Sequence, residues 1–187
     1  MRIISGNFKG KRIFEPIDIK TRPIKDLTKE SIFNLINHSN KFSVDIKKSQ
    51  ILDLFSGTGS FGIECISREA KFVTFIENYS RVLPILKKNL SSLKSINNFE
   101  IIEMDIFKDL NIKYLKKKYD LIFMDPPYKE DKIEFLVKTI LNSKILKSKG
   151  VMILHRHKKQ QDNFPQNFRI IDERKYGISK IIFGTFS

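Results

Sequence analysis

The sequence lacks the residues and runs on which several classes of protein depend. Cys65 is the only cysteine among 187 residues, which excludes an internal disulfide and a cysteine-rich zinc site. No apolar run approaches the length needed to cross a bilayer, so we expect no membrane partner. The basic amino terminus, residues 1–6, has no long apolar region and no cleavage site of a secretory signal. Together these absences predict a cytoplasmic protein.

Acidic residues are scarce relative to basic ones. The chain has 35 Lys and Arg against 21 Asp and Glu, a formal net charge of +14. Such a field attracts polyanions, of which nucleic acid and an anionic membrane are the obvious candidates. A solvated, lysine-rich surface gives the same excess, so charge alone does not decide. The length and a hydrophobic content of 41% predict one well-packed domain.

The most informative stretch is a short apolar run, residues 119–124, that ends abruptly in Asp125-Pro126-Pro127-Tyr128. It predicts a buried parallel strand that stops at the carboxyl edge of a sheet, where ligands of open α/β sheets bind. The prolines have no N–H and a nearly fixed φ, so the backbone after Asp125 is extended and stiff. A carboxylate, the Pro126 carbonyl and the Tyr128 ring suit a planar group that carries an NH2. By itself, the tetrapeptide also fits a strand end whose Asp caps the next helix.

A glycine-rich turn follows an earlier apolar strand. The pattern Asp53-x-Phe55-x-Gly57-x-Gly59 leads from this strand into a helical segment at residues 61–68. The glycines let the backbone approach a ligand closely. Asp53 precedes them, which favours a ligand with an ammonium group over one with a phosphate. A lone Gly-x-Gly is weak evidence, but the strand and the acid strengthen it.

Further acids stand at the ends of the next predicted strands. The strand at residues 71–77 ends in Glu77, which can accept both hydroxyls of a ribose. The strand at residues 99–103 is followed by Asp105, a candidate acceptor for an adenine amino group, and by Ile106, which can lie against the ring. Each acid separately is more simply a cap or a surface charge. Acids at the ends of three successive strands, before a fourth that ends in Asp125, favour a nucleotide-binding site at this edge of the sheet.

The first 25 residues concentrate positive charge. Residues 3–14 alternate around a glycine-containing turn, which predicts a small β-hairpin. Lys or Arg stands at seven positions of residues 1–25, and Asp or Glu at two. A basic arm with Phe8 interleaved suits single-stranded or distorted RNA, although a solvated edge hairpin protected by its lysines has the same composition. The candidate RNA-binding residues are Arg2, Lys9, Lys11, Arg12 and Arg22.

The remaining segments predict regular elements and no metal. Helical patterns cover residues 80–93 and 133–146, a strand covers 151–154, and a closing hairpin covers 168–183. The lysine cluster at residues 113–118 is most simply a solvated helix face. His155 and His157 alternate on the fifth strand, but no matching Cys, His or acid spacing supports a metal site.

With both motifs in place, the chain resembles S-adenosylmethionine-dependent methyltransferases that act on exocyclic amines, and more closely the RsmD family of 16S ribosomal RNA guanine-N2 methyltransferases. The likeness covers nearly the whole chain. Arg22-Pro23 ahead of Phe33-Asn34 separates this family from other enzymes with the same Asp-Pro-Pro-Tyr motif. Residues 24–27, Ile-Lys-Asp-Leu, stand where the family usually has Thr-Thr-Asp-Arg, and Glu69 replaces a usual glycine.

The resemblance implies an α/β, Rossmann-like class I methyltransferase with a seven-stranded, mostly parallel sheet and an antiparallel last strand. A β-hairpin arm, residues 1–25, would precede the methyltransferase domain, residues 26–187. The implied partner is small-subunit ribosomal RNA or the assembling 30S subunit, and we expect a monomer. The implied catalytic residues are Asp125, Pro126, Pro127 and Tyr128. The implied S-adenosylmethionine-binding residues are Asp53, Phe55, Gly57, Gly59, Glu77, Asp105 and Ile106.

Other functions remain open at this point. An adenine-N6 nucleic-acid methyltransferase shares both motifs, but it usually carries a target-recognition domain for which this chain has little room. A glutamine methyltransferase of release factors typically has Asn first in the Pro-Pro-Tyr motif. A non-catalytic RNA-binding assembly factor would keep the basic hairpin without the acids at strand ends. An NAD-dependent dehydrogenase would need three glycines at dinucleotide spacing.

Overall fold

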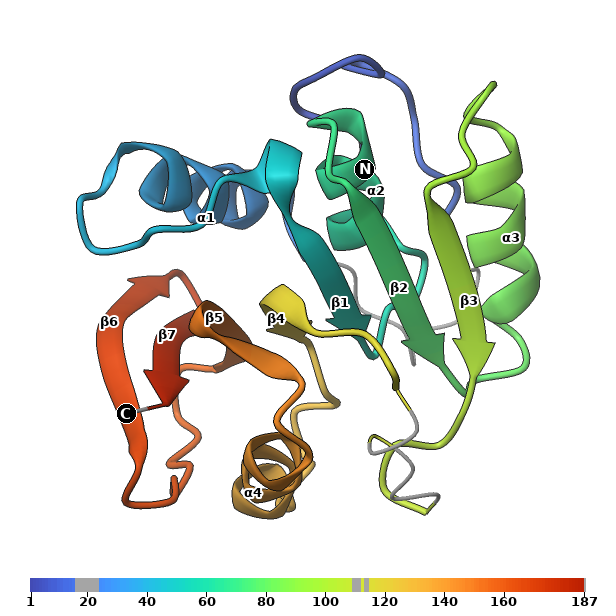
Figure 1. The fold of residues 1–187 in the computed structure, drawn as a ribbon. Coiled ribbons are helices and arrows are strands. Elements are labelled where there is room, and N and C mark those ends of the chain that lie inside the picture. The colour runs from blue at the N-terminus through green and yellow to red at the C-terminus, as the bar shows by residue number, and fades with distance from the viewer. Residues whose placement is uncertain (16–23, 109–111, 113–114, 187) are drawn as a thin grey trace.

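The computed structural model describes residues 1–15, 24–108, 112 and 115–186, which form a central sheet with helices on both faces (Figure 1). The strands are β1 (Gln50–Leu54), β2 (Phe72–Glu77), β3 (Phe99–Glu103), β4 (Tyr119–Met124), β5 (Leu146–His157), β6 (Phe168–Tyr176) and β7 (Ser179–Phe186). The helices are α1 (Asp26–His38), α2 (Ser60–Ser67), α3 (Leu83–Ser91) and α4 (Ile133–Ser143), with a 3-10 turn at Ile46–Lys48.

The sheet has seven strands in the order β3-β2-β1-β4-β5-β7-β6. The pairs from β3 to β5 are parallel, and β7 runs antiparallel to both β5 and β6. This arrangement confirms the predicted fold class. The strand order reverses between β1 and β4, so a crevice opens beyond the carboxyl ends of these two strands, the usual ligand position in such sheets.

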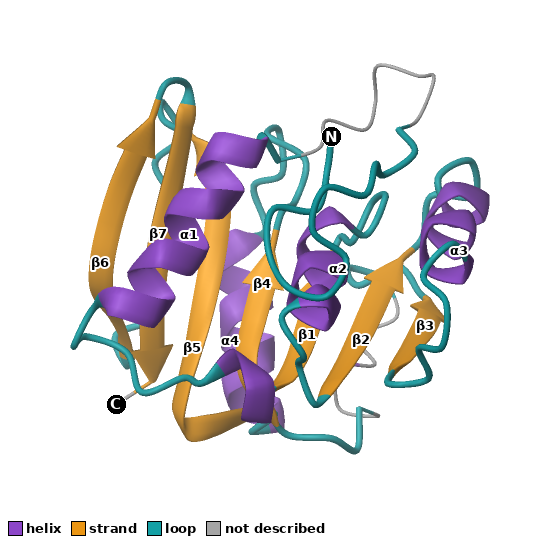
Figure 2. Ribbon diagram, turned by 90° about the horizontal axis from the view of Figure 1, so that it is seen from above, coloured by secondary structure: helices purple, strands orange, loops and turns teal. Residues whose placement is uncertain are grey.

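Two apolar layers sandwich the sheet. Helices α1, α2 and α3 cover one face and α4 covers the other (Figure 2). Neighbouring residues of β1 point to opposite layers: Ile51 packs with the first three helices and Leu52 with α4, and both are fully buried. On the first face the Phe61 ring lies between Phe33 and Phe123, with centroids 5.1 Å and 3.9 Å away. This stack fixes α1 and α2 against β4.

The amino-terminal segment is folded onto α2. Its two predicted strands reduce to a single antiparallel bridge between Arg2 and Arg12. The Glu64 carboxylate of α2 accepts hydrogen bonds from the backbone N–H groups of Ile4 and Ser5, at 2.8 and 3.0 Å. Because α2 accepts hydrogen bonds from these backbone N–H groups, the two strands do not need a longer ladder of hydrogen bonds between them.

Several element bounds differ from those expected. Helix α3 begins at Leu83 because Pro84, which lacks an N–H, is favoured in a first turn. Helix α4 ends at Ser143, where Lys144 turns into the left-handed region with φ 51°. Strand β5 extends to His157. Residues 115–118 are not helical, and Lys117 instead pairs with Glu100 at 2.6 Å.

No helix among the described residues is both long enough and apolar enough to traverse a bilayer.

Candidate functional site

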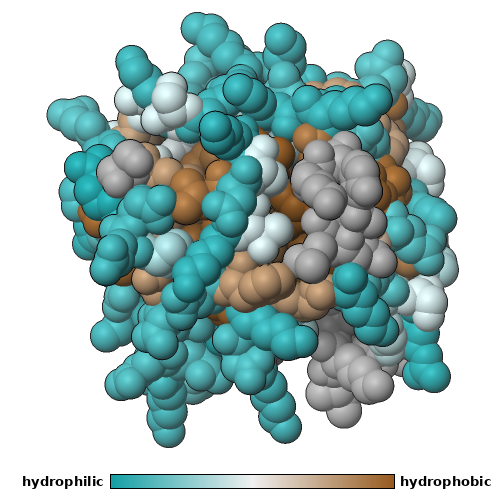
Figure 3. Space-filling model, turned by 60° about the horizontal axis from the view of Figure 1, so that its bottom comes forward, coloured by the Kyte–Doolittle hydropathy of each residue, from teal (hydrophilic) through white to brown (hydrophobic). Residues whose placement is uncertain are grey.

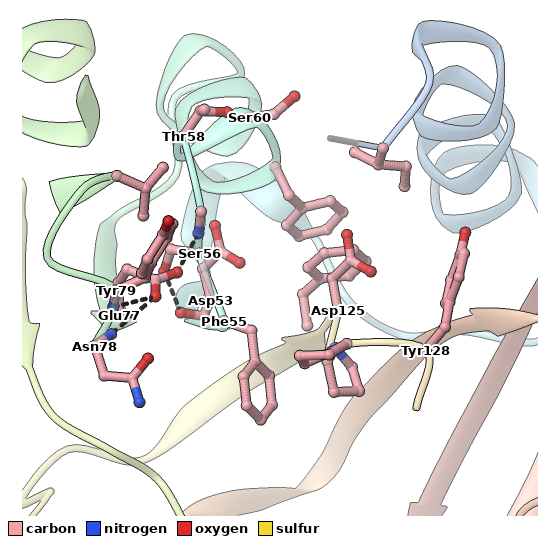
Figure 4. A pocket seen from close by; sticks show the side chains of 17 residues that line it. Asp53, Phe55, Ser56, Thr58, Ser60, Glu77, Asn78, Tyr79, Asp125 and Tyr128 are labelled. Carbon is pink, nitrogen blue, oxygen red and sulfur yellow. Dashed lines mark hydrogen bonds between the residues drawn. The ribbon is translucent and has the colours of Figure 1, made fainter. Parts of the chain in front are cut away.

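A cavity of about 490 Å³ lies at the carboxyl edge of the parallel strands. Its wall comes from the segments that follow β1, β2 and β4, from the first residues of α2, and from Ile24. Apolar side chains gather in the middle of this face, among hydrophilic ones (Figure 3). In the close view, Asp53 and Glu77 lie on one side of the cavity and Asp125 and Tyr128 on the other (Figure 4). The sheet therefore brings together acids that are far apart in the sequence.

Asp53 is almost completely buried, with 1% of its surface exposed. Its Oδ2 accepts the backbone N–H of Gly62 at 2.9 Å. A Cβ at Gly62 would come within 2.9 Å of that same oxygen and 2.3 Å of the Phe75 ring, so this position requires glycine. Burial raises the Asp53 pKa well above its ordinary value; the Gly62 bond opposes the shift, and the charges of Asp125 and Glu77 add to it.

The glycine turn has two parts with different roles. Gly57 lines the cavity with φ 55°, and Phe55 beside it lines the cavity in the same left-handed region, with φ 60°. Gly59, with φ 83°, is instead the N-cap residue, directly before α2 begins. A Cβ on Gly59 would lie 2.5 Å from the Leu86 side chain, so this glycine allows α3 to pack closely.

Glu77 organises the turn from the second strand. Its Oε2 accepts the Gly57 N–H at 2.7 Å, and its Oε1 accepts those of Asn78 and Tyr79 at 2.9 and 2.8 Å. A carboxylate has about four acceptor positions, so these bonds leave about one for a ligand hydroxyl. The predicted grip on two ribose hydroxyls would require one of these backbone bonds to open.

Asp105 and Ile106 are not part of the cavity wall. The Asp105 carboxylate accepts the backbone N–H groups of Phe107 and Lys108, at 3.0 and 3.3 Å, and so stabilises its own turn. Ile106 is 5% exposed and packs in the layer beneath α4. Their contact with an adenine ring therefore stays a prediction.

The Asp-Pro-Pro-Tyr segment contributes all four of its residues to the cavity wall. Asp125 follows β4, and its backbone N–H donates to the Leu54 carbonyl at 3.3 Å, which ties it to the end of β1. Its Oδ1 lies 2.8 Å from Nδ1 of His155 on β5. The Asp125 carboxylate thus lines the cavity while its Oδ1 is hydrogen-bonded to His155 on the neighbouring strand.

Side chains from β5 and the loop after it hold this segment in place. The Arg156 guanidinium donates to the carbonyls of Pro127 and Glu130, at 3.1 and 2.6 Å. The Gln160 amide donates to the Tyr128 carbonyl at 2.6 Å. Since this segment is outside the sheet, its carbonyls find hydrogen-bond donors in these side chains, and the side chains in turn fix its backbone.

Arg156 is held in turn by Asp162. Its side chain is 2% exposed, and Nη2 lies 2.9 Å from Asp162 Oδ1. Lys180 on β7 lies 3.9 Å from the other oxygen of Asp162. A buried guanidinium needs such a partner because its desolvation is costly.

For the histidines of β5 the sequence raised only the question of a metal, and no pattern in it pointed to a role for Arg156 or Gln160. The available signal was the interruption of an apolar strand by His-Arg-His beside the strand that ends in Asp125. No group of three or more metal-ligating side chains occurs in the part of the chain that is described.

Among the described residues of the amino-terminal segment, the basic ones do not line this cavity. Lys9 and Arg12 are exposed, and Arg2 lies 4.0 Å from Asp26. The Lys11 amine bonds to the carbonyl of Ser92 at the end of α3. Arg22, the remaining candidate, falls outside the described residues.

The chain is similar to known proteins along nearly its whole length. The family model "Conserved hypothetical protein 95" matches residues 1–185. Ribosomal RNA small subunit methyltransferase D of Buchnera aphidicola subsp. Acyrthosiphon pisum is 35% identical, over 92% of this chain and 86% of its own. That of Haemophilus influenzae is 31% identical, over 95% of this chain and 90% of its own. The solved structure of yhhF from Escherichia coli has a TM-score of 0.80 and 25% identity, and the match covers 98% of this chain and 96% of that one.

The buried Asp53 carboxyl leads to a prediction about stability. Because its pKa is raised in the folded protein, its contribution to stability is complete below the unfolded pKa, about 3.9 for Asp, and is lost as the pH rises through the folded pKa. Asn can accept the Gly62 N–H without ionising. We expect Asp53→Asn to exceed the wild type in free energy of unfolding at neutral pH and to match it in acid, measured by urea denaturation across pH.

Asp172 provides a control of opposite sign. Burial alone would raise its pKa, but hydrogen bonds from Lys41 at 2.7 Å and Arg174 at 3.1 Å outweigh burial and lower it. Asp172→Asn should therefore be less stable than the wild type at neutral pH, with the difference lost as the pH falls. A destabilised Asp53→Asn protein at neutral pH would contradict the desolvation argument.

Proposed function

Because the chain belongs to the RsmD family, we propose that it transfers the methyl group of S-adenosylmethionine to the exocyclic N2 of a guanine in 16S ribosomal RNA, in the cytoplasm. The observation that carries the proposal is the convergence of Asp53, Glu77 and the Asp125–Tyr128 segment on one cavity. A non-catalytic RNA-binding protein would have no use for buried acids at this position, since phosphates repel them.

The chemistry of the cavity fits S-adenosylmethionine. The cofactor carries two cationic centres, an ammonium and a sulfonium, together with an apolar adenine ring. Asp53 offers a desolvated carboxyl whose ionised form a nearby cation would favour. Glu77 would accept a ribose hydroxyl, and the Phe55 and Val82 side chains give the wall apolar surface for the ring. The bound cofactor would supply an electrophilic methyl group.

The amine needs activation more than the methyl group does. An aryl NH2 is a poor nucleophile because its lone pair is delocalised into the base. Hydrogen bonds from the NH2 to the Asp125 carboxylate and the Pro126 carbonyl would favour a pyramidal nitrogen with a localised lone pair. Asp125 would also stabilise the positive charge that develops on that nitrogen during transfer.

Tyr128 would bind the target base. Its ring lines the cavity beside Asp125, and its backbone is held through Gln160. A base inside a helix is inaccessible to this cavity, so the guanine must leave its stack and lie against the Tyr128 ring. Stacking on an aromatic ring typically contributes about 1–3 kcal/mol per base. This orientation would present the exocyclic amine to Asp125.

Identification of the product tests the proposed reaction directly. We expect the purified protein, incubated with labelled S-adenosylmethionine and unmodified 16S ribosomal RNA or 30S subunits, to yield N2-methylguanosine, detected by mass spectrometry of the nucleosides. Comparison of naked RNA with assembled subunits identifies the preferred substrate. N6-methyladenine as the sole product would refute the proposal in favour of an adenine methyltransferase.

Asp125 should act in transfer and not in cofactor binding. Asp125→Ala removes a preorganised charged acceptor, which commonly costs on the order of 100-fold or more in rate. Asp125→Asn keeps an acceptor oxygen, so we expect a rate between those of the Ala variant and the wild type. Both should bind S-adenosylmethionine in calorimetry much as the wild type does. Loss of cofactor binding in either variant would contradict this division of labour.

The exposed cations of the amino-terminal segment should bind RNA. Lys9→Gln combined with Arg12→Gln removes two charges and should weaken RNA binding, with a salt-dependence slope lower by about 0.7–0.9 for each phosphate that the protein no longer neutralises. Lys138→Gln with Lys175→Gln removes the same charge from α4 and β6, where the side chains are 52% and 62% exposed. Equal weakening in both pairs would show that net charge, and not this segment, governs binding.

A further inference from the structure

His155 occupies a distinctive position between the Asp-Pro-Pro-Tyr segment and the closing hairpin. It lies near the end of β5, and only 4% of its surface is exposed. Its Nδ1 lies 2.8 Å from Asp125 Oδ1, and its Nε2 lies 2.8 Å from the Ser179 hydroxyl at the start of β7. Both ring nitrogens are therefore engaged, one by the residue that follows β4 and the other by the first residue of β7.

These two contacts determine the direction of the hydrogen bonds. An ionised carboxylate only accepts, so the imidazole must donate from Nδ1 to Asp125. In the neutral ring Nε2 is then an acceptor, and the Ser179 hydroxyl can rotate to donate to it. The result is a directed chain from Ser179 through His155 to Asp125. The Asp125 carboxylate, which only accepts, sets this tautomer, and the Ser179 hydroxyl stabilises it by donating to Nε2.

This series of hydrogen bonds fixes the orientation of the Asp125 carboxylate. Oδ1 takes the imidazole N–H from the β5 side, so Oδ2 is the oxygen left for an amine in the cavity. An acceptor that can rotate loses alignment with the attacking nitrogen, and a misplacement of about 1 Å can cost on the order of 100-fold in rate. His155 also meets the edge of the Tyr128 ring, at 6.0 Å between centroids.

We propose that His155 is a positioning residue that, with Ser179, orients the Asp125 carboxylate toward the target amine. The inference rests on the proposed methyl transfer and deepens it, because it assigns the orientation of the acceptor to a strand outside the Asp-Pro-Pro-Tyr segment. It predicts an effect on kcat with little effect on the KM for S-adenosylmethionine, since Asp53 and Glu77 form the other side of the cavity.

Two amide substitutions separate positioning from packing. In His155→Asn the side-chain NH2 occupies the place of Nδ1 and can donate to Asp125; in His155→Gln it reaches toward the place of Nε2. We expect kcat to stay within about tenfold of the wild type in the Asn variant and to fall by up to about 100-fold in the Gln variant. Thermal unfolding and calorimetry with S-adenosylmethionine on both variants establish that each is folded and binds the cofactor.

His157 is the matched control. It lies two residues further along β5 and meets the same Tyr128 ring at 5.4 Å, while its Nδ1 accepts the Lys159 backbone N–H at 3.2 Å. If the role of His155 were only to pack against Tyr128, His157→Gln should lower kcat as much as His155→Gln does. We expect the His157 variant to remain within a few-fold of the wild type.

Nitrogen NMR of the imidazole gives a readout that does not depend on activity. In the wild type we expect His155 to carry its proton on Nδ1, and Asp125→Ala, which removes the acceptor, should raise the fraction protonated on Nε2. A wild-type proton on Nε2, or equal kcat in the Asn and Gln variants, would overturn the positioning role. Failure of the proposed function can be told apart from failure of the positioning role, because in the first case the wild type itself would form no N2-methylguanosine.

Discussion

The crowding of carboxyl groups at one edge of the sheet is the constraint on which the site depends. Asp53, Glu77 and Asp125 lie at the carboxyl ends of three adjacent parallel strands or directly after them, so the fold itself brings them to one cavity. Buried like charges repel each other and lose hydration, as the raised pKa of Asp53 records. Backbone N–H groups offset this cost. The glycine turn provides one to Glu77 and the first turn of α2 provides one to Asp53, so these segments stabilise the acids.

Each of the three acids is supported differently, and the difference matches the role proposed for it. Asp53 has one backbone donor and is desolvated, a state that a bound cation would relieve. Glu77 has three backbone donors and is thereby fixed in one orientation. Asp125 is oriented by a side chain, His155, whose own orientation depends on another strand. The proposed cofactor site and the proposed amine acceptor are therefore fixed by separate parts of the sheet.

A buried lysine joins the amino-terminal segment to this site. The Lys29 amine, on α1, donates to the Arg2 carbonyl at 3.0 Å and to the Ser60 hydroxyl at 3.1 Å, and it lies 3.7 Å from Glu64. Burial lowers its pKa, and the nearby Glu64 and Asp26 carboxylates oppose that shift. Ser60 lines the cavity. The surface proposed to bind RNA and the proposed cofactor turn are thus parts of one hydrogen-bonded unit.

The sequence by itself determined the parallel strands, the glycine turn and the acids that end β1, β2 and β4, because each is a local pattern of apolar run, turn residue and charge. It also determined the family, because Asp53–Gly59 and Asp125–Tyr128 are contiguous motifs. Only the tertiary structure decided which acids share the cavity: the Asp105 carboxylate bonds within its own turn and does not line it. Only the tertiary structure also showed that His155, Arg156 and Gln160 support the Asp-Pro-Pro-Tyr segment. These contacts join residues about 26 to 32 positions apart across β4, β5 and the loop after it. Strand order and pairing set them, because they place β5 and its loop beside the end of β4, which is distant in the sequence.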